Sequence, residues 1–223
     1  MTIIDNVKKL REEIASVCSR AGRDESEITV VAASKYVGAE GILEAHEAGI
    51  KHFGENRVQD ALDKIEKCPD GITWHFIGHL QRNKVTKVVG NFEFIHSVDS
   101  FRLAEKIQQV AEDNDIVQKI MLEVNISGED SKFGLESDVV MKLVEEVISQ
   151  NNLHLTGLMT MAPFTDDEAQ IRPVFRGLRR LRDDIETRFD KKLPNLSMGM
   201  TNDWQIAIEE SATHLRIGSA IFK

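Results

Sequence analysis

Strand-like and helix-like segments alternate along almost the whole chain, and this alternation restricts the possible folds more than any other feature. Eight short runs of β-branched or apolar residues are separated by longer segments in which apolar residues recur with helical spacing. The expected strands are residues 28–34, 52–55, 74–77, 92–96, 119–126, 153–159, 196–198 and 214–217. The expected helices between them are residues 41–45, 57–67, 101–112, 137–149, 168–188 and 203–210. Strands that alternate with helices pair in parallel through right-handed crossovers, so an α/β fold is predicted.

Eight such strands predict a single (β/α)8 barrel of the TIM type. These barrels have about 250 residues, with a lower limit near 200, and the chain has 223. Little sequence follows the last expected strand, so the amphipathic segment 3–21 is expected to supply the missing outer helix. A doubly wound open sheet is the competing fold. No Pro/Gly/Ser-rich linker, repeat or low-complexity tract interrupts the sequence, so one domain is expected over residues 1–223.

Charge and composition exclude several functional classes. Lys and Arg number 28 against 37 for Asp and Glu, a net charge of −9 that disfavours binding to nucleic acid or to anionic lipid. No apolar run approaches the roughly 20 residues of a membrane helix, and residues 1–6 lack the layout of a signal peptide. Cys18 and Cys68 lie far apart and suggest neither a disulfide framework nor a redox pair. A cytoplasmic protein is therefore expected.

Lys35 is the first candidate for chemistry, because it follows the first expected strand. Active sites of (β/α)8 barrels lie at the carboxyl ends of their strands. A lysine there would point across the barrel mouth, and partial desolvation would lower its pKa and leave the amine nucleophilic, as Schiff-base chemistry requires. The structural alternative is a lysine whose aliphatic stem is buried while its ammonium group reaches solvent.

Two further loops carry a glycine beside a hydroxyl residue. Ser197 and Gly199 lie at the end of the seventh expected strand, and Gly218 and Ser219 follow the eighth. The loops after strands seven and eight are the recurring phosphate site of these barrels. Glycine permits close approach of the backbone, while hydroxyl and N–H groups bind phosphate. Together with Lys35, these loops favour an aldehyde that carries a phosphate, either pyridoxal 5′-phosphate (PLP) or a phosphorylated sugar.

Several sequence blocks resemble the YggS/PROSC family, the pyridoxal phosphate homeostasis proteins. The longest block is Trp-His-Phe-Ile-Gly-His-Leu-Gln-Arg-Asn-Lys at residues 74–84, and its length makes it highly specific. The other blocks are residues 30–35, 53–56, 157–161, 196–200 and 216–222. They follow the order of the family from the first strand to the C-terminus, so the resemblance covers nearly the whole chain.

The resemblance implies a barrel like the N-terminal domain of alanine racemase, with PLP bound as an aldimine on Lys35. It places Arg216 opposite the pyridine nitrogen and Asn56 and His79 near the ring. The implied phosphate grip consists of Ser197, Gly199, Gly218 and Ser219, and Met198 is a further implied cofactor-binding residue. The family is regarded as a carrier or regulator of PLP in vitamin B6 and amino-acid balance, without an established catalytic turnover.

Other functional possibilities remain beside the carrier hypothesis. A PLP-dependent amino-acid racemase would use the same site but needs an acid or base opposite Lys35, and a Schiff-base aldolase is a third possibility. PLP-requiring apo-enzymes are the expected acceptors, and a monomer is expected. No metal site is expected, because His75 and His79 lie on a strand and its following loop. The glycine-containing loop 127–134 is a candidate lid, and its Lys132 is a candidate second amine for PLP.

Overall fold

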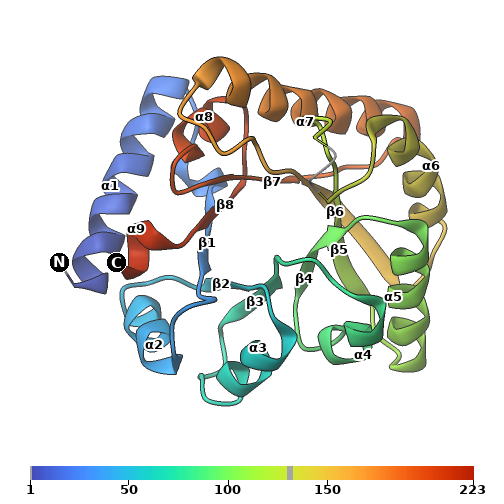
Figure 1. Ribbon diagram of the computed structural model, residues 1–223, viewed down its shortest axis with the longest axis horizontal. Helices are drawn as coiled ribbons and strands as arrows, with labels where there is room; N and C mark the ends of the chain where they lie inside the picture. Colours follow the sequence, from blue (N-terminus) through green and yellow to red (C-terminus); the bar gives the residue numbers. More distant parts are fainter. Residues whose placement is uncertain (1, 130–132) are drawn as a thin grey trace.

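The computed structural model describes residues 2–129 and 133–223, apart from the side chains of residues 137 and 138. Within these residues eight parallel strands form a closed barrel in sequence order, with helices around it (Figure 1). The strands are β1 (Thr29–Ala33), β2 (His52–Glu55), β3 (Thr73–Phe76), β4 (Phe94–Val98), β5 (Gln118–Glu123), β6 (Leu153–Met159), β7 (Asn195–Met200) and β8 (His214–Ile217). This closed barrel confirms the (β/α)8 prediction and excludes the doubly wound open sheet.

The barrel closes where the first strand pairs with the last. β1 lies between β2 and β8, with Val31 opposite His52 on one side and opposite Arg216 on the other. The pairing of β7 with β8 is irregular between Ser197 and Met200. Because a slip of one residue turns the following side chains to the other face of a strand, this irregularity decides which groups at the end of β7 face the barrel interior.

The bounds of β4 and β5 differ from the predicted ones because of contacts with distant parts of the sequence. β4 begins at Phe94 rather than at Phe92, whose carbonyl oxygen accepts a hydrogen bond from the side chain of Gln118. β5 ends at Glu123. The amide of Val124 still donates to Met159 of β6, but from Asn125 onward the backbone pairs with Leu135. Both differences arise from contacts between residues distant in the sequence, which hydrophobic periodicity does not report.

The helices form a ring outside the barrel (Figure 1). They are α1 (Ile3–Ala21), α2 (Ala39–Glu47), α3 (Val58–Ile65), α4 (Val85–Val88), α5 (Phe101–Asp113), α6 (Ser137–Ile148), α7 (Glu168–Phe189), α8 (Trp204–Glu209) and α9 (Ser219–Phe222), with short 3-10 turns η1 (Glu25–Glu27) and η2 (Arg82–Lys84). None of the helices in the described part of the chain is long and apolar enough to cross a membrane.

The N-terminal helix completes the outer ring, as expected from the sequence. α1 packs against α2, α8 and α9, beside the C-terminus (Figure 1). Thr2 and Asp5 cap its start through reciprocal hydrogen bonds of 3.1 Å, and Val7 and Leu10 are buried on its inner face. The side chain of Asn6 donates to backbone carbonyl oxygens in the C-terminal segment, Ile221 at 3.0 Å and Lys223 at 3.1 Å.

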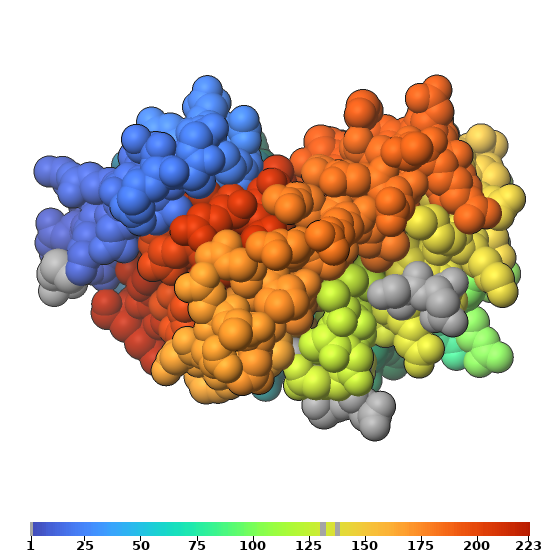
Figure 2. Space-filling model, turned by 90° about the horizontal axis from the view of Figure 1, so that it is seen from above, coloured from blue at the N-terminus to red at the C-terminus, as the bar shows by residue number. Residues whose placement is uncertain are grey.

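The longest helix, α7, lies along the outside of the C-terminal segment. Figure 2 shows its orange residues beside the red residues that include α8. Glu210 follows α8, and its nearly buried carboxylate accepts hydrogen bonds from Arg172 at 3.2 Å and from Arg176 at 2.8 Å. These arginines therefore serve in part to hold α7 against α8.

Candidate functional site

A cavity of about 520 Å³ opens at the carboxyl end of the barrel. Its walls come from the segments that follow β1, β6, β7 and β8, which are the positions where (β/α)8 barrels carry their active sites. The residues that line it are Ala33, Lys35, Tyr36, Val37, Pro163, Phe164, Thr165, Met200, Thr201, Asn202, Asp203, Arg216, Gly218, Ser219, Phe222 and Lys223. Its volume lies within the range of small-molecule sites, about 300–1,000 Å³.

Lys35 lies at the rim of this cavity, in a turn after β1. The turn is closed by a hydrogen bond of 2.9 Å from the amide of Val37 to the carbonyl oxygen of Ser34. The side chain of Lys35 is exposed, and its Nζ lies 5.1 Å from the centre of the Tyr36 ring. The expected partial burial of this lysine is therefore wrong, because the turn carries it beyond the end of the strand and toward solvent.

A buried carboxylate holds the Lys35 turn from outside the barrel. Oε1 of Glu55 accepts hydrogen bonds from the Ser34 hydroxyl at 2.6 Å and from the Lys64 ammonium at 2.7 Å. Lys64 also donates to the carbonyl oxygen of Ser34 at 2.9 Å. No pattern in the sequence predicts this support, although a charged residue, Glu55, ends the expected strand 52–55.

Arg216 supplies a positive charge at the floor of the cavity. Its guanidinium donates to Oγ of Ser197 at 2.6 Å and to the carbonyl oxygen of Thr160 at 2.9 Å. Burial lowers the pKa of Arg216 to about 10, while the carboxylates of Asp203 and Glu123 act in the opposite direction. The group therefore stays charged at neutral pH, and it lines the same cavity as Lys35, as expected.

Two buried carboxyl groups accompany Arg216, and the sequence analysis identified neither. Burial and the nearby charge of Asp99 raise the pKa of Glu123 to about 7, although Arg216 lowers it. Burial also raises the pKa of Asp203, against the hydrogen bond of 2.5 Å that its Oδ1 accepts from the Met200 amide. The pKa of Glu123 is therefore near neutral pH, and its carboxyl group interacts with Arg216, which lines the cavity.

The residues expected to bind phosphate fall into two groups. Gly218 and Ser219 line the cavity, with Thr201 3.3 Å from the Ser219 hydroxyl. Ser197, Met198 and Gly199 are buried within β7 instead. A direct phosphate contact from the Ser197 hydroxyl is not supported, because this group faces the barrel interior and bonds to Arg216 and His96.

Asn56 and His79 line a neighbouring cavity of about 330 Å³ rather than the one at Lys35. Nδ1 of His79 lies 3.2 Å from Oδ2 of Asp99, and its ring stacks on Phe133 with the ring centres 4.1 Å apart. The structure therefore does not bring these two residues together with Lys35. Part of the candidate lid 127–134, including Lys132, lies outside the described residues.

The histidines do not assemble a metal centre. Among residues 2–129 and 133–223, no three His, Cys, Asp or Glu side chains are placed to hold a metal ion. Four histidines instead pack inside the barrel, which apolar side chains usually fill. They are His52, His75, His96 and His214.

Known proteins resemble this chain over almost its full length. Residues 6–223 match the model of the alanine racemase N-terminal domain. The chain is 43% identical to the pyridoxal phosphate homeostasis protein of Aquifex aeolicus, over 100% of this chain and 98% of that relative. It is 37% identical to the protein of that name from Pseudomonas aeruginosa, over 99% of this chain and 95% of that relative.

Solved structures agree in fold. PipY of Synechococcus elongatus PCC7942, solved with PLP bound, superposes with a TM-score of 0.88 at 31% identity and full coverage of both chains. Alanine racemase of Clostridium difficile 630 superposes with a TM-score of 0.81 at 12% identity, over 97% of this chain and 56% of that chain, and shows the fold alone. The chain therefore consists almost entirely of an alanine racemase N-terminal domain and belongs to the family of pyridoxal phosphate homeostasis proteins.

Proposed function

We propose that this protein binds PLP in the cavity at the carboxyl end of its barrel and acts as a carrier or regulator of PLP, without efficient turnover. One observation carries the proposal. Lys35, Arg216 and the pair Gly218 and Ser219 come from opposite ends of the sequence, yet they line a single cavity. The cavity thus offers an amine for an aldehyde, a cation for a ring nitrogen and a glycine-hydroxyl pair for a phosphate.

These groups suit PLP chemically, because each complements a different part of it. PLP supplies an aldehyde that can be held covalently by an amine. The amine of Lys35 would form a C=N bond with the aldehyde carbon of PLP and release one water molecule. Because Lys35 is exposed, an amine of another protein could replace it on that carbon and free the lysine. Gly218 and Ser219 would bind the phosphate together with Thr201. We propose apo-enzymes that require PLP as the acceptors, and a monomer as the working form.

Arg216 favours the binding of PLP over catalysis with it. A guanidinium stays protonated, so it discourages protonation of a pyridine nitrogen placed against it. An unprotonated ring withdraws electrons less strongly and stabilises a carbanion poorly. The interior hydrogen bonds to Ser197 and Thr160 keep the guanidinium in place. This arrangement supports a binding role, because it disfavours carbanion chemistry on the cofactor.

A racemase-like activity is the second candidate, and Glu123 is the observation that favours it. An acid-base catalyst works best when its pKa is near the operating pH, and the pKa of Glu123 is raised to about 7. This group interacts electrostatically with Arg216, which lines the cavity. Assays for racemisation of a panel of amino acids, with wild-type protein and Glu123→Gln, would distinguish the two candidates.

The decisive experiment compares two lysines that line the same cavity. The protein and its Lys35→Ala and Lys223→Ala variants would be incubated with PLP and their visible absorption spectra recorded. We expect the band of lysine-bound PLP in the wild type and in Lys223→Ala, and its loss in Lys35→Ala. Reduction with borohydride followed by peptide mass spectrometry should place the cofactor on Lys35. A wild-type protein without any band, or a band that survives in Lys35→Ala, would overturn the proposal.

A further inference from the structure

A continuous chain of hydrogen bonds runs through the barrel interior and ends on Arg216. Nδ1 of His52 lies 3.0 Å from Nε2 of His75, and Nδ1 of His75 lies 2.8 Å from Nε2 of His96. Nδ1 of His96 lies 2.9 Å from Oγ of Ser197, which accepts a hydrogen bond of 2.6 Å from Arg216. Side chains from β2, β3, β4, β7 and β8 thus form one linked polar chain.

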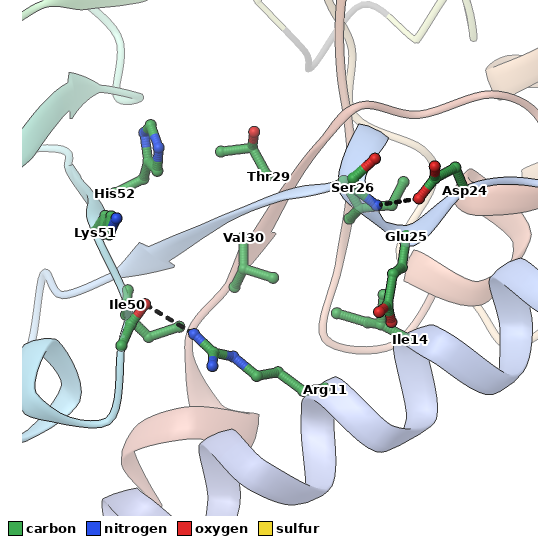
Figure 3. A pocket seen from close by; sticks show the side chains of 12 residues that line it. Arg11, Ile14, Asp24, Glu25, Ser26, Thr29, Val30, Ile50, Lys51 and His52 are labelled. Atoms are coloured by element: carbon green, nitrogen blue, oxygen red, sulfur yellow. Dashed lines mark hydrogen bonds between the residues drawn. The ribbon is translucent and has the colours of Figure 1, made fainter.

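The two ends of this hydrogen-bond chain, His52 and Arg216, lie at opposite ends of the barrel. Arg216 lines the cavity at the carboxyl ends of the strands. His52 is half-buried and lines a cavity of about 510 Å³ at their amino ends, where it lies beside Lys51 (Figure 3). Between these ends His75, His96 and Ser197 are fully buried.

The direction of the chain follows from its donors and acceptors. Arginine only donates hydrogen bonds, so the Ser197 oxygen must be an acceptor toward Arg216. Ser197 is fully buried, and His96 is the other partner of its hydroxyl among the described residues. A buried O–H group without an acceptor costs free energy, so the Ser197 hydroxyl donates to Nδ1 of His96.

The same reasoning fixes the histidine tautomers in turn. With Nδ1 of His96 as an acceptor, its proton is on Nε2 and is donated to Nδ1 of His75. Nε2 of His75 then donates to Nδ1 of His52. Burial and the neighbouring histidines lower the pKa of His75 and His96 well below the usual value, with Arg216 adding to the effect at His96. Both imidazoles are therefore neutral, as this arrangement requires.

We propose that Ser197, His96 and His75 are positioning residues that fix the guanidinium of Arg216 at the cavity floor through one oriented hydrogen-bond chain. This inference rests on the proposed function, since the group to be held against Arg216 is the pyridine ring of PLP. The chain makes the Ser197 hydroxyl donate to His96, which leaves the serine oxygen available to accept from Arg216. If the Ser197 hydroxyl could rotate freely, the guanidinium would lose a fixed acceptor and could move away from the ring site.

His214 provides a matched control within the same interior. Its ring is buried and lies 5.9 Å from the ring of His75 and 6.0 Å from that of His96, centre to centre. Its Nδ1 instead pairs with Oγ1 of Thr213 at 3.0 Å. Replacing His214 therefore perturbs the packing of the interior and leaves the chain to Arg216 intact.

The first test needs no cofactor. Nitrogen-15 NMR of the PLP-free protein at pH 7.5 reports which imidazole nitrogen carries the proton. We expect His52, His75 and His96 to be neutral with the proton on Nε2. A proton on Nδ1 of His96, or a charged His96 or His75, would overturn the proposal whatever the protein does with PLP.

The second test measures PLP binding by absorption titration. His96→Leu removes the acceptor for Ser197 and should weaken PLP binding about tenfold, the size expected for a lost hydrogen bond to a charged group. His96→Asn restores an acceptor near the position of Nδ1 and should recover most of the affinity, while His214→Leu should change it less than threefold. Equal losses of PLP affinity in His96→Leu and His214→Leu, or no recovery of affinity in His96→Asn, would contradict the proposed role of the hydrogen-bond chain. Should His96→Leu fail to fold, the NMR result decides. Absence of PLP binding in the wild type would refute the proposed function and leave the tautomer result standing.

Discussion

Lys64 of α3 donates a hydrogen bond of 2.9 Å to the carbonyl oxygen of Ser34, the residue immediately before Lys35. It also pairs with the fully buried Glu55, whose Oε1 lies 2.7 Å away. A helix outside the barrel therefore holds the turn that presents the candidate anchor lysine, so the position of this amine depends on residues that never contact the cavity.

Lys64→Met should lower both stability and PLP affinity. Removing one partner of a buried ion pair costs about 3–5 kcal/mol, because the remaining charge stays unpaired, and Lys64 is 12% exposed while Glu55 is fully buried. Urea unfolding measures the stability and absorption titration the affinity. Lys67→Met is the control, since Lys67 is exposed and belongs to the same segment of the chain. Equal behaviour of the two variants would show that the Lys64 contacts do not hold the turn.

The protein should lose stability at mildly acidic pH. Burial lowers the pKa of His75, His96 and His214 in the folded state, for His214 to about 3. Below pH 6.5 these histidines bind protons in the unfolded chain but not in the folded chain. Their contribution to the free energy of unfolding is therefore fully present above pH 6.5 and falls as the pH decreases. Each histidine contributes a loss of about 1.4 kcal/mol per pH unit.

Urea unfolding between pH 8 and pH 5 checks this expectation. Because the pKa of Glu123 is raised, its protonation increases the stability of the folded state as the pH falls below 7. This gain offsets the stability lost through only one of the three histidines. A free energy of unfolding that stays constant from pH 7 to pH 5 would contradict the neutral, buried state of the imidazoles.

Glu123→Gln should stabilise the protein above pH 7. The pKa of Glu123 is raised from 4.5 to about 7, so the folded state favours the protonated carboxyl, and this advantage is lost as the pH rises through 7. At pH 8 the neutral amide should therefore add up to about 3 kcal/mol to the free energy of unfolding. The gain should shrink toward pH 4.5. Glu112→Gln, an exposed site on α5, is the control and should show no such dependence.

Gly199→Ala should be more destabilising than Gly22→Ala. Both glycines have a positive φ, +92° and +66°, which costs a residue with a side chain about 1 kcal/mol. An added Cβ at Gly199 would lie 2.6 Å from Cβ of Ala207, whereas nothing lies within 4 Å of one at Gly22. Differential scanning calorimetry should give the lower melting temperature for Gly199→Ala. Equal melting temperatures would show that the loop between β7 and α8 can move aside.

The barrel itself was predictable, because its signals are local. Each strand is a short apolar run and each helix an amphipathic segment, so order and number follow from the sequence alone. The position of Lys35 after the first strand followed from the same pattern. Its exposure did not, because the turn that carries it is fixed by hydrogen bonds between Ser34 in the turn, Glu55 on β2 and Lys64 on α3.

The interior of the barrel could not be predicted in the same way. Alternation along a strand separates two faces, but which of them points inward depends on the pairing with neighbouring strands. Ser197 pairs with the interior residue His214 and points to the barrel interior, where it bonds to Arg216, although the sequence suggested a phosphate contact. The hydrogen bond between His96 and Ser197 spans 101 positions of the sequence, so no local pattern reports it.

The hydrogen bond from Asn6 to Ile221 joins positions 215 apart in the sequence. While the chain is being synthesised, α1 is complete long before its partners in α8 and α9 exist, and β1 likewise waits for β8. During that interval α1 can pack against α2 but lacks the surface that α8 and α9 supply. The closed barrel therefore depends on contacts that can form only after both ends of the chain have been synthesised. Because Phe222 and Lys223 line the cavity at the carboxyl end of the barrel, the contacts that join the two ends of the chain also complete the wall of that cavity.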